Sequence, residues 1–380
     1  MRMIYINGSR IPTEKAHGLQ IMKMCEAFAI DGHEVELWVP KRLNFIKQDP
    51  FDYYGVEKIF KIKKIPCIDL VTHFSFLGPV AFWITELSFL FFSSFYLLRS
   101  REDIIYTRDK FVAFIFSFLK NNVFFEAHTD IPRIFLKRLG KIKGIIVITN
   151  NLKKIFQDSG ISQDMIIVAP DGVDLEEFTI KETQQECRKK LSLPQDRKIV
   201  LYTGHLYPWK GVDVLLEAAK LPIFNYQFPN TLFVFVGGID KDIRSFKEKA
   251  RGLDNVKIVG HRLHKEIPCW LRAADVLVLP NSGKYDISKY WTSPLKLFEY
   301  MASGKPIVAS DLPSIREILN EDNAVLVEPD NQESLAKGIG EVLRDGVFDD
   351  KISKQAFLDV ENYTWSKRAD SIIKFIQQSL

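Results

Sequence analysis

The stretch WTSPLKLFEYMASGKPIVAS occupies residues 291–310 and combines a helix start, an apolar helical face and a strand. Ser293 followed by Pro294 predicts the start, because a hydroxyl caps free backbone N–H groups and a proline needs no donor at the first helical position. Gly304 is predicted to end the helix in the left-handed conformation. The apolar run IVA then follows as a short strand.

The residues before this helix add another strand, the apolar run VLVLP at 276–280. Strand, helix and strand form one βαβ unit, whose helix N-terminus points to the carboxyl edge of a parallel sheet. Free N–H groups there favour an anion such as a phosphate, so Ser293, Pro294 and Leu295 are candidate phosphate contacts. Glu299 lies about 7 Å further along the helix, where it can reach the ribose of a nucleotide. An ordinary buried helix with an exposed glutamate is the alternative.

The run SPLKLFEYMASGKPIVAS also resembles the nucleotide-sugar signature of glycosyltransferase family 4, which are retaining group 1 glycosyltransferases of the GT-B fold. The resemblance implies two Rossmann-like, doubly wound parallel-sheet domains facing a cleft, with a C-terminal helix that returns to the first domain. The family often has two glutamates separated by seven residues. Glu299 matches the second, which binds the ribose. Trp291 stands at the position of the first, so the contacts to the donor sugar depart from the family pattern.

Composition suits two soluble α/β domains, with 380 residues, 46% hydrophobic and 26% charged. The chain opens directly on a predicted strand, without a signal peptide. The four cysteines are scattered and lack metal spacing, so we expect a cytoplasmic protein without a bound metal or cofactor.

Charge is uneven along the chain. Residues 1–170 hold 23 Lys and Arg against 17 Asp and Glu, a net charge of +6, and the remaining residues hold 29 against 31. The basic residues 133, 137, 138, 141 and 143 are predicted to share a helix at 131–144.

The apolar run at 79–98 reaches the length of a membrane span, but it is interrupted by Glu86. It is expected to be a buried crossover helix or one with an apolar face at a membrane. We therefore expect peripheral contact with anionic membrane, and no nucleic acid, since no recognition motif accompanies the charge.

The first domain is predicted to open with a strand at 3–8, a loop, a helix and a second strand at 33–40. The dinucleotide fingerprint G-x-G-x-x-G is missing. Gly18 ends the first loop, where doubly wound domains present ligand-facing groups, and the resemblance implies that it lies beside the donor. A later strand, NVFFEAHTD at 122–130, is expected to bring Glu126, His128 and Asp130 to the same edge. The family resemblance assigns His128 a place near the transferred sugar.

The second domain is predicted to open with KIVLYTGHLYPWKGVDVLLEAAK at 198–220. Gly204 ends its first strand, and Lys210 stands beside Gly211 at a helix start, which suits phosphate binding. The pattern G-x-x-x-x-W-K-G resembles the family motif. His205 occupies a position where the family often has arginine.

The sequence thus predicts domains at 1–170 and 171–362, with residues 363–380 as the returning helix. The expected function is transfer of a sugar from a UDP- or GDP-linked donor to a hydroxyl acceptor, with a lipid-linked or polysaccharide precursor as the plausible acceptor. His128, Lys210 and Glu299 are the expected catalytic residues. A GT-B isomerase or phosphorylase, or a non-catalytic nucleotide-sugar binder, are the alternatives.

Overall fold

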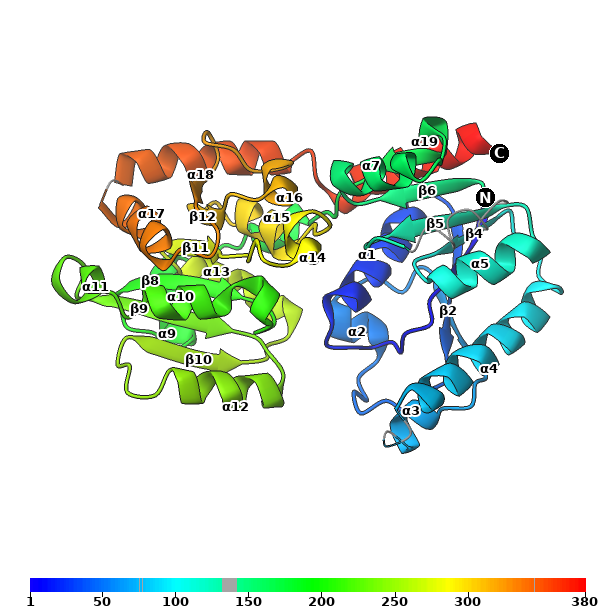
Figure 1. The fold of residues 1–380 in the computed structure, drawn as a ribbon, viewed down its shortest axis with the longest axis horizontal. Helices are drawn as coiled ribbons and strands as arrows, with labels where there is room; N and C mark the ends of the chain where they lie inside the picture. The colour runs from blue at the N-terminus through cyan, green and yellow to red at the C-terminus, as the bar shows by residue number, and fades with distance from the viewer. Residues whose placement is uncertain (75, 77, 132–141, 345) are drawn as a thin grey trace. The chain divides into compact units, whose positions relative to one another are not determined.

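The computed structural model describes all residues except 75, 77, 132–141 and 345. The described chain forms two compact units, Met1–Pro170 with Trp365–Leu380 and Asp171–Thr364. Each unit holds a parallel sheet between layers of helices (Figure 1). The predicted helix at 131–144, with Arg133, Lys137, Arg138 and Lys141, falls mostly outside the described residues.

The first unit contains a parallel sheet of seven strands, whose order reverses between β1 and β4. Tyr5 on β1 lies opposite Leu37 on one side and Tyr106 on the other. Such a reversal leaves a crevice outside the carboxyl ends of the two strands. In sheet order the strands are β3 (Lys61–Ile65), β2 (Glu34–Pro40), β1 (Arg2–Ile6), β4 (Ile104–Thr107), β5 (Val123–Ala127), β6 (Gly144–Val147) and β7 (Ile166–Val168).

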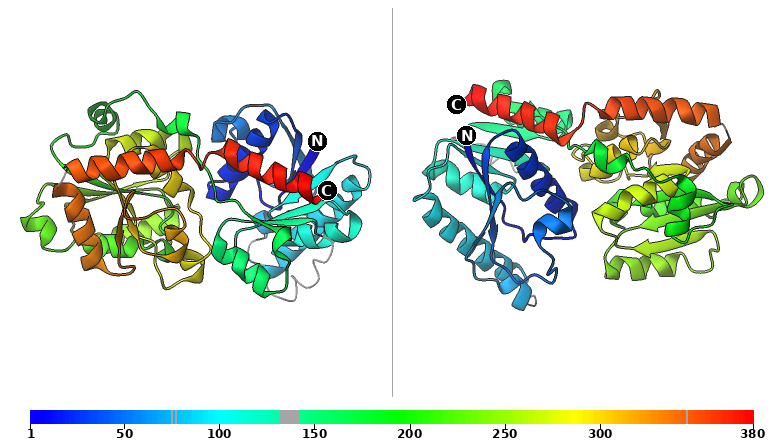
Figure 2. Two further views of the ribbon diagram at one scale, coloured as in Figure 1. Left: turned by 90° about the horizontal axis from the view of Figure 1, so that it is seen from above. Right: turned by 180° about the vertical axis from the view of Figure 1, so that it is seen from behind.

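Helices cover both faces of this sheet. Apolar side chains of α4 and α5, including Phe89 and Phe116, pack on Ile4, Ile6 and Trp38. On the other side α1 packs against the C-terminal helix α19, which confirms the predicted return of that helix to the first unit (Figure 2). The helices are α1 (Ala16–Ile30), α2 (Pro50–Tyr54), α3 (Leu70–His73), α4 (Pro79–Leu97), α5 (Lys110–Leu119), α7 (Asn150–Asp158) and α19 (Trp365–Ser379), with a 3-10 turn η2 (Gln163–Met165).

Helix α4 connects strand β3 to strand β4 of the sheet, and it is only partly buried. Phe91 is 69% exposed and Leu87 is 55% exposed. By length and composition α4 could cross a membrane, and it is the one such helix in the described part of the chain. Its exposed large apolar side chains, named together as the α4 apolar face, are Val80, Phe82, Trp83, Ile84, Leu87, Phe91 and Phe95.

The second unit repeats the architecture with six parallel strands, and its order reverses between β8 and β11. Lys198–Thr203 on β8 pairs in continuous register with Thr231–Val236 on β9. In sheet order the strands are β10 (Val256–Gly260), β9 (Thr231–Val236), β8 (Lys198–Thr203), β11 (Val276–Leu279), β12 (Ile307–Ser310) and β13 (Val325–Val327).

Two apolar cores, one on each face, hold the helices of the second unit to its sheet. One core joins α10, α12 and α17, and the other joins α13, α15 and α18. The helices are α8 (Leu175–Phe178), α9 (Gln184–Lys190), α10 (Val212–Ala218), α11 (Ile223–Tyr226), α12 (Asp240–Lys249), α13 (Ile267–Ala273), α14 (Asp286–Lys289), α15 (Leu295–Ala302), α16 (Pro313–Arg316), α17 (Gln332–Arg344) and α18 (Gly346–Val360), with 3-10 turns η3 (Pro208–Lys210) and η4 (His264–Glu266).

Candidate active site

The crevice of the second unit begins at Gly204, directly after β8. Gly204 is exposed and has φ +124°, a conformation that favours glycine. Gly237, after the neighbouring strand β9, approaches it closely, since a Cβ on Gly237 would lie 2.3 Å from the Gly204 carbonyl oxygen. These two glycines leave the backbone at the end of β8 open to a ligand.

A third glycine fixes the position of Lys210. Gly211 has φ +69°, and a Cβ there would lie 1.7 Å from the carbonyl oxygen of Pro280, directly after β11. The turn η3 therefore packs against the end of β11 without space for a side chain at residue 211. This contact holds Lys210 at the reversal of strand order, where doubly wound sheets bind ligands.

Two lysines meet at this point. Lys296, only 8% exposed, donates from Nζ to the Thr203 carbonyl oxygen at 3.0 Å and lies 3.6 Å from the centroid of the Tyr202 ring. Lys210 places its Nζ 3.9 Å from the centroid of the Trp209 ring. Burial lowers the pKa of Lys210 to about 7. Burial, and then the charge of Lys210, hold the pKa of Lys296 well below its usual value. An anion bound beside both ammonium groups would relieve their repulsion.

Glu299 lies one turn further along α15 and is 8% exposed. Its Oε1 is 3.0 Å from Nε2 of His264, whose Nδ1 is 3.2 Å from Oε1 of Glu177. Burial lowers the pKa of His264, but hydrogen bonds to the two glutamates outweigh it and raise the pKa to about 9. His264 is therefore protonated at neutral pH and fixes the orientation of the Glu299 carboxylate.

The start of α15 differs from the sequence prediction by one residue. The helix begins at Leu295 and Pro294 occupies the N-cap position, with its carbonyl oxygen accepting from the Leu297 amide at 2.8 Å. Ser293 does not cap the helix, because its Oγ instead accepts a hydrogen bond from the Asp171 amide at 2.9 Å. Gly304 has φ +63°, as predicted for the helix end.

His205 lies in the same loop as Lys210, and its ring stacks on Tyr207 with 4.9 Å between centroids. Tyr207 in turn stacks on Trp209 at 6.2 Å. The three rings form a row that ends beneath the Lys210 ammonium group. The stacked rings therefore hold Trp209 in place, and the Trp209 ring in turn positions the Lys210 ammonium group.

Two further side chains near α15 and β11 contain buried polar atoms without a hydrogen-bond partner among the described residues. They are the indole Nε1 of Trp291 and both amide atoms of Asn281, a fully buried side chain. Buried polar groups are normally paired, so both side chains are candidate ligand contacts. Trp291 stands where the family pattern has its first glutamate.

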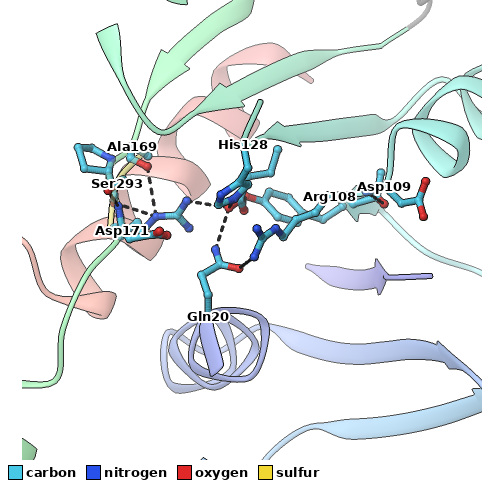
Figure 3. Close-up of polar contacts among 12 residues, drawn as sticks. Gln20, Arg108, Asp109, His128, Ala169, Asp171 and Ser293 are labelled. Atoms are coloured by element: carbon cyan, nitrogen blue, oxygen red, sulfur yellow. Dashed lines mark hydrogen bonds and ion pairs between the residues drawn. The ribbon is translucent and has the colours of Figure 1, made fainter. Parts of the chain in front are cut away.

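In the first unit, Glu126 is fully buried at the end of β5 and contacts Gln20 and His128, which are labelled in Figure 3. Its carboxylate accepts from Gln20 at 2.7 Å, from Arg368 on α19 at 2.9 Å and from the Tyr106 hydroxyl. Burial raises the pKa of Glu126, but the positive charge of Arg368 and the hydrogen bond from His128 hold it well below its usual value. Glu126 therefore joins the sheet to α1 and α19.

The predicted cluster of Glu126, His128 and Asp130 is thus wrong in part. Only His128 lines the pocket of this unit. Its Nε2 lies 2.5 Å from Glu126 Oε1, so the buried carboxylate orients the ring. Asp130 is exposed, whereas Glu126 is held in the core by hydrogen bonds from Gln20, Tyr106 and Arg368.

Gly18 is buried within α1 and does not line the pocket. A Cβ at this position would lie 2.1 Å from the Tyr54 hydroxyl and 2.6 Å from Cγ2 of Thr13. The Tyr54 hydroxyl donates to the Thr13 carbonyl oxygen at 2.8 Å. The structure therefore gives Gly18 a packing role, since its missing side chain lets Tyr54 hold the loop before α1.

The pocket has a volume of about 730 Å³ and opens at the reversal between β1 and β4. His17 and His128 lie in its wall. Burial and the positive charges of Arg108 and Lys15 lower the pKa of His17 to about 3, so it is neutral. In the described part of the chain, no three His, Cys, Asp or Glu side chains are grouped to hold a metal ion. Metal independence stays a prediction.

Residues 197–345, which include both lysines and Glu299, match the family Glycosyl transferases group 1. This matched segment lies within the second unit. Phosphatidyl-myo-inositol mannosyltransferase of Mycobacterium tuberculosis is 29% identical over 241 residues, which cover 62% of this chain and 59% of that protein. An uncharacterized glycosyltransferase of Methanocaldococcus jannaschii is 27% identical over 239 residues, 60% of this chain and 58% of that protein. The chain thus spans less than two thirds of the length of these curated relatives.

Solved structures resemble the whole chain. Sucrose-phosphate synthase from Thermosynechococcus elongatus has a TM-score of 0.79 at 19% identity, covering 99% of this chain and 98% of that one. The Anabaena protein HepE in complex with UDP-glucose has a TM-score of 0.75 at 17% identity, covering 100% of both chains. These similarities and the two parallel sheets confirm the predicted GT-B fold.

Sequence reasoning missed Lys296, His264 and Asn281 as site residues. A signal for Lys296 was present, because it precedes Glu299 by three residues and so shares its helical face. His264 comes from a separate segment, after β10, and only folding brings it to Glu299.

Proposed function

We propose that the protein transfers a sugar from a nucleotide diphosphate sugar, with UDP or GDP as the nucleotide, to a hydroxyl group of an acceptor. The observation that carries the proposal is the closeness of Lys210 to Lys296, which lies beside Gly204, within the residues that match Glycosyl transferases group 1. Two lysine side chains at the end of a strand suit a diphosphate, whose negative charge would favour their protonated forms. The complex of HepE with UDP-glucose supports a nucleotide-sugar donor.

In this proposal the reaction breaks the bond between the sugar and the diphosphate, and negative charge grows on the departing phosphate. Fixed positive groups stabilise that charge without reorganising during the reaction. Binding of the diphosphate would raise the pKa of Lys210, so the lysine is charged in the donor complex. Lys210 and Lys296 then take the place that a metal ion has in other transferases. Retention of the anomeric configuration rests on the family resemblance.

Glu299 is proposed to accept hydrogen bonds from the ribose hydroxyls. His264 supports this role, because its protonated imidazole contacts one carboxylate oxygen and fixes the orientation of the side chain. In the first unit, His128 is proposed to contact the transferred sugar, with Glu126 holding its ring.

The proposal is tested with a panel of UDP- and GDP-linked sugars, scored for nucleotide release and for sugar transfer to an added acceptor. A transferase releases nucleotide and forms a glycosylated acceptor. An isomerase alters the sugar without transfer, and a phosphorylase needs phosphate as its second substrate. A binding protein shows affinity without turnover. Any of these three alternative results would replace the proposed activity.

Replacing Glu299 with alanine is expected to weaken binding of the donor nucleotide about 10- to 100-fold. Hydrogen bonds to a charged group contribute roughly 1.5–3 kcal/mol, which corresponds to that range. Calorimetry with the nucleotide that the panel selects measures the effect. Glu333→Ala, which removes an exposed carboxylate from α17, serves as the control. Equal affinity of both variants would exclude Glu299 from the ribose site.

We further propose that the protein is cytoplasmic and touches the inner membrane surface through the α4 apolar face to reach a lipid-linked acceptor. Basic side chains accompany this face, since Arg99 stacks 3.8 Å from the centroid of the Phe95 ring and β3 carries Lys61, Lys63 and Lys64. Apolar side chains beside basic ones suit an anionic lipid surface. The name of the mycobacterial relative, a phosphatidyl-myo-inositol mannosyltransferase, supports a lipid acceptor.

The double variant Leu87→Ser, Phe91→Ser is expected to reduce binding to anionic vesicles at least about tenfold, because it removes apolar area that the lipid would bury. Co-sedimentation with vesicles of anionic and of neutral lipid measures binding, and added salt should weaken it. Leu358→Ser changes an exposed leucine of the second unit and is the control. Wild-type protein that binds neither vesicle, or both equally, would contradict the membrane proposal and leave the transferase proposal intact.

A further inference from the structure

The pocket of the first unit contains a pair of carboxyl groups at the reversal of strand order. Asp109 follows β4, Gly8 follows β1, and Glu86 reaches the pocket from α4. The point where a Cβ on Gly8 would sit lies 2.6 Å from Oδ2 of Asp109 and 3.2 and 3.3 Å from the two oxygens of Glu86. Three carboxyl oxygens therefore surround a space that only the absence of a side chain at residue 8 keeps open.

The two carboxyl groups differ in what stabilises their charge. Oδ1 of Asp109 caps α5, accepting from the Phe111 amide at 2.8 Å and the Val112 amide at 3.3 Å. N–H groups at a helix start favour an ionised cap. Oδ2 is the oxygen that faces Gly8 and Glu86. Oδ1 of Asp109 thus has backbone donors, whereas Oδ2 is left facing Glu86.

Glu86 carries the proton of the pair at neutral pH. It is 7% exposed, and burial followed by the charge of Asp109 raises its pKa to about 8, against the smaller opposing effect of Arg42. Cys67 also faces Glu86, and burial and Asp69 raise the pKa of its thiol to about 11, so it stays neutral. A protonated acid beside a carboxylate offers one O–H donor and several acceptor oxygens.

The hydrogen bond between Glu86 and Asp109 does not satisfy every oxygen of the pair. Oε1 of Glu86 is buried and has no hydrogen-bond partner among the described residues. Buried polar atoms are normally paired, and this one lies in the wall of a pocket. A hydroxyl group both donates and accepts, so it matches an acid and a carboxylate together.

We propose that Glu86 and Asp109 bind a hydroxyl group of the acceptor, and that this acceptor is a sugar or another polyol. The assignment rests on the proposed transferase function. Elsewhere in the pocket wall basic side chains, among them Lys15 and Lys110, outnumber the one further acidic side chain, Glu14, so phosphorylated polyols are tested beside their parents.

The test uses the full chain and four probes, which are glucose, glucose 6-phosphate, myo-inositol and myo-inositol 1-phosphate. Calorimetric titration measures the affinity of each probe and, in the same preparations, of UDP and GDP. We expect at least one probe to bind the wild-type protein. Glu86→Ala and Gly8→Ala should each weaken that binding about tenfold or more, while nucleotide affinity stays unchanged. A wild-type protein that binds none of the four probes would overturn the proposal.

Glu86→Gln is the more specific test, because an amide keeps a donor and an acceptor but does not titrate. It should bind the probe as well as the wild type at pH 7. Between pH 7 and pH 9 the wild-type affinity should fall, because Glu86 loses its proton, whereas the Glu86→Gln affinity should hold. The same fall in both proteins would overturn the assignment, as would unchanged affinity in Glu86→Ala.

Glu102→Gln is the matched control, since it changes a carboxylate of the same unit that precedes β4 and pairs with Lys120 at 3.0 Å, away from the pocket. Sugar transfer separates the two proposals. If no sugar is transferred to any acceptor, the proposed function fails. If sugar is transferred and Glu86→Ala leaves the KM of the acceptor unchanged, only the present inference fails.

Discussion

Lys210→Ala is expected to lower kcat for sugar transfer about 10²- to 10³-fold, the range for removing one fixed donor from a developing negative charge. The loss should appear mainly in kcat and less in the KM of the donor, because the diphosphate gains charge as the bond to the sugar breaks. Structure supports this expectation, since Gly211 packs the turn against Pro280 and the Trp209 ring lies beneath the ammonium group. The lysine is therefore held in place before substrate binds.

Steady-state kinetics with the donor selected from the panel measures both constants. Lys210→Arg should recover only part of the rate, since a planar guanidinium differs in shape from an ammonium group. Lys220→Ala, which removes an exposed lysine paired with Glu217, should match the wild type. If Lys210→Ala raises the KM of the donor and keeps kcat, Lys210 binds the donor but does not stabilise the transition state.

Arg368→Ala is expected to lower the free energy of unfolding of the first unit by about 3–5 kcal/mol, because it leaves the buried Glu126 carboxylate without its strongest opposing charge. Arg368 is 5% exposed, and besides Glu126 its Nε donates to the Pro170 carbonyl oxygen at 2.9 Å. One side chain thus ties α19 to β5 and to the end of the segment that follows β7. The variant therefore removes both an ion pair and a hydrogen bond to the backbone.

Hydrogen exchange of peptides from residues 1–170 measures this loss, since it reports on one unit of a two-unit chain. Lys374→Ala, an exposed position on the same helix, should leave exchange unchanged. Because the pKa of Glu126 is held below its usual value, its contribution is present above about pH 4.5 and is lost as the pH falls further. In Arg368→Ala, the stability of the first unit should therefore fall less as the pH is lowered. A loss below about 1 kcal/mol would show that His128, Gln20 and Tyr106 satisfy Glu126 alone.

The sequence predicts much of the fold because the signals are local. Apolar runs such as those at 104–107 and 276–279 mark buried parallel strands, and helical spacing between them marks crossover helices. The resemblance around residues 291–310 adds the GT-B architecture and the return of the last helix, both of which the structure has. The cap of α15 is the exception. Ser293 has the residue type of a cap, but the Asp171 amide, far away in sequence, takes its hydroxyl.

The residues of the candidate site are predicted less well, because their roles depend on segments that are distant in the sequence. Glu299, Lys210 and Gly204 follow from a motif and its spacing. Gly18 has the position of a ligand contact, yet the Tyr54 hydroxyl fills the space beside it. Glu126 is held in the core by Arg368 of the distant helix α19, whereas His128 reaches the pocket. These outcomes depend on neighbours supplied by other elements.

By itself, the sequence determined the α/β class, the order of the strands along the chain and the motif that carries Lys210 and Glu299, because each depends on residues close together in the chain. Only the tertiary structure decided which charges meet. Lys296 lies beside Lys210, His264 between Glu177 and Glu299, and Glu86 beside Asp109. In each case the side chains come from separate parts of the chain, and burial then shifts the pKa values of Lys210, His264 and Glu86. Proximity and burial both arise when the sheets form, so no local pattern encodes them.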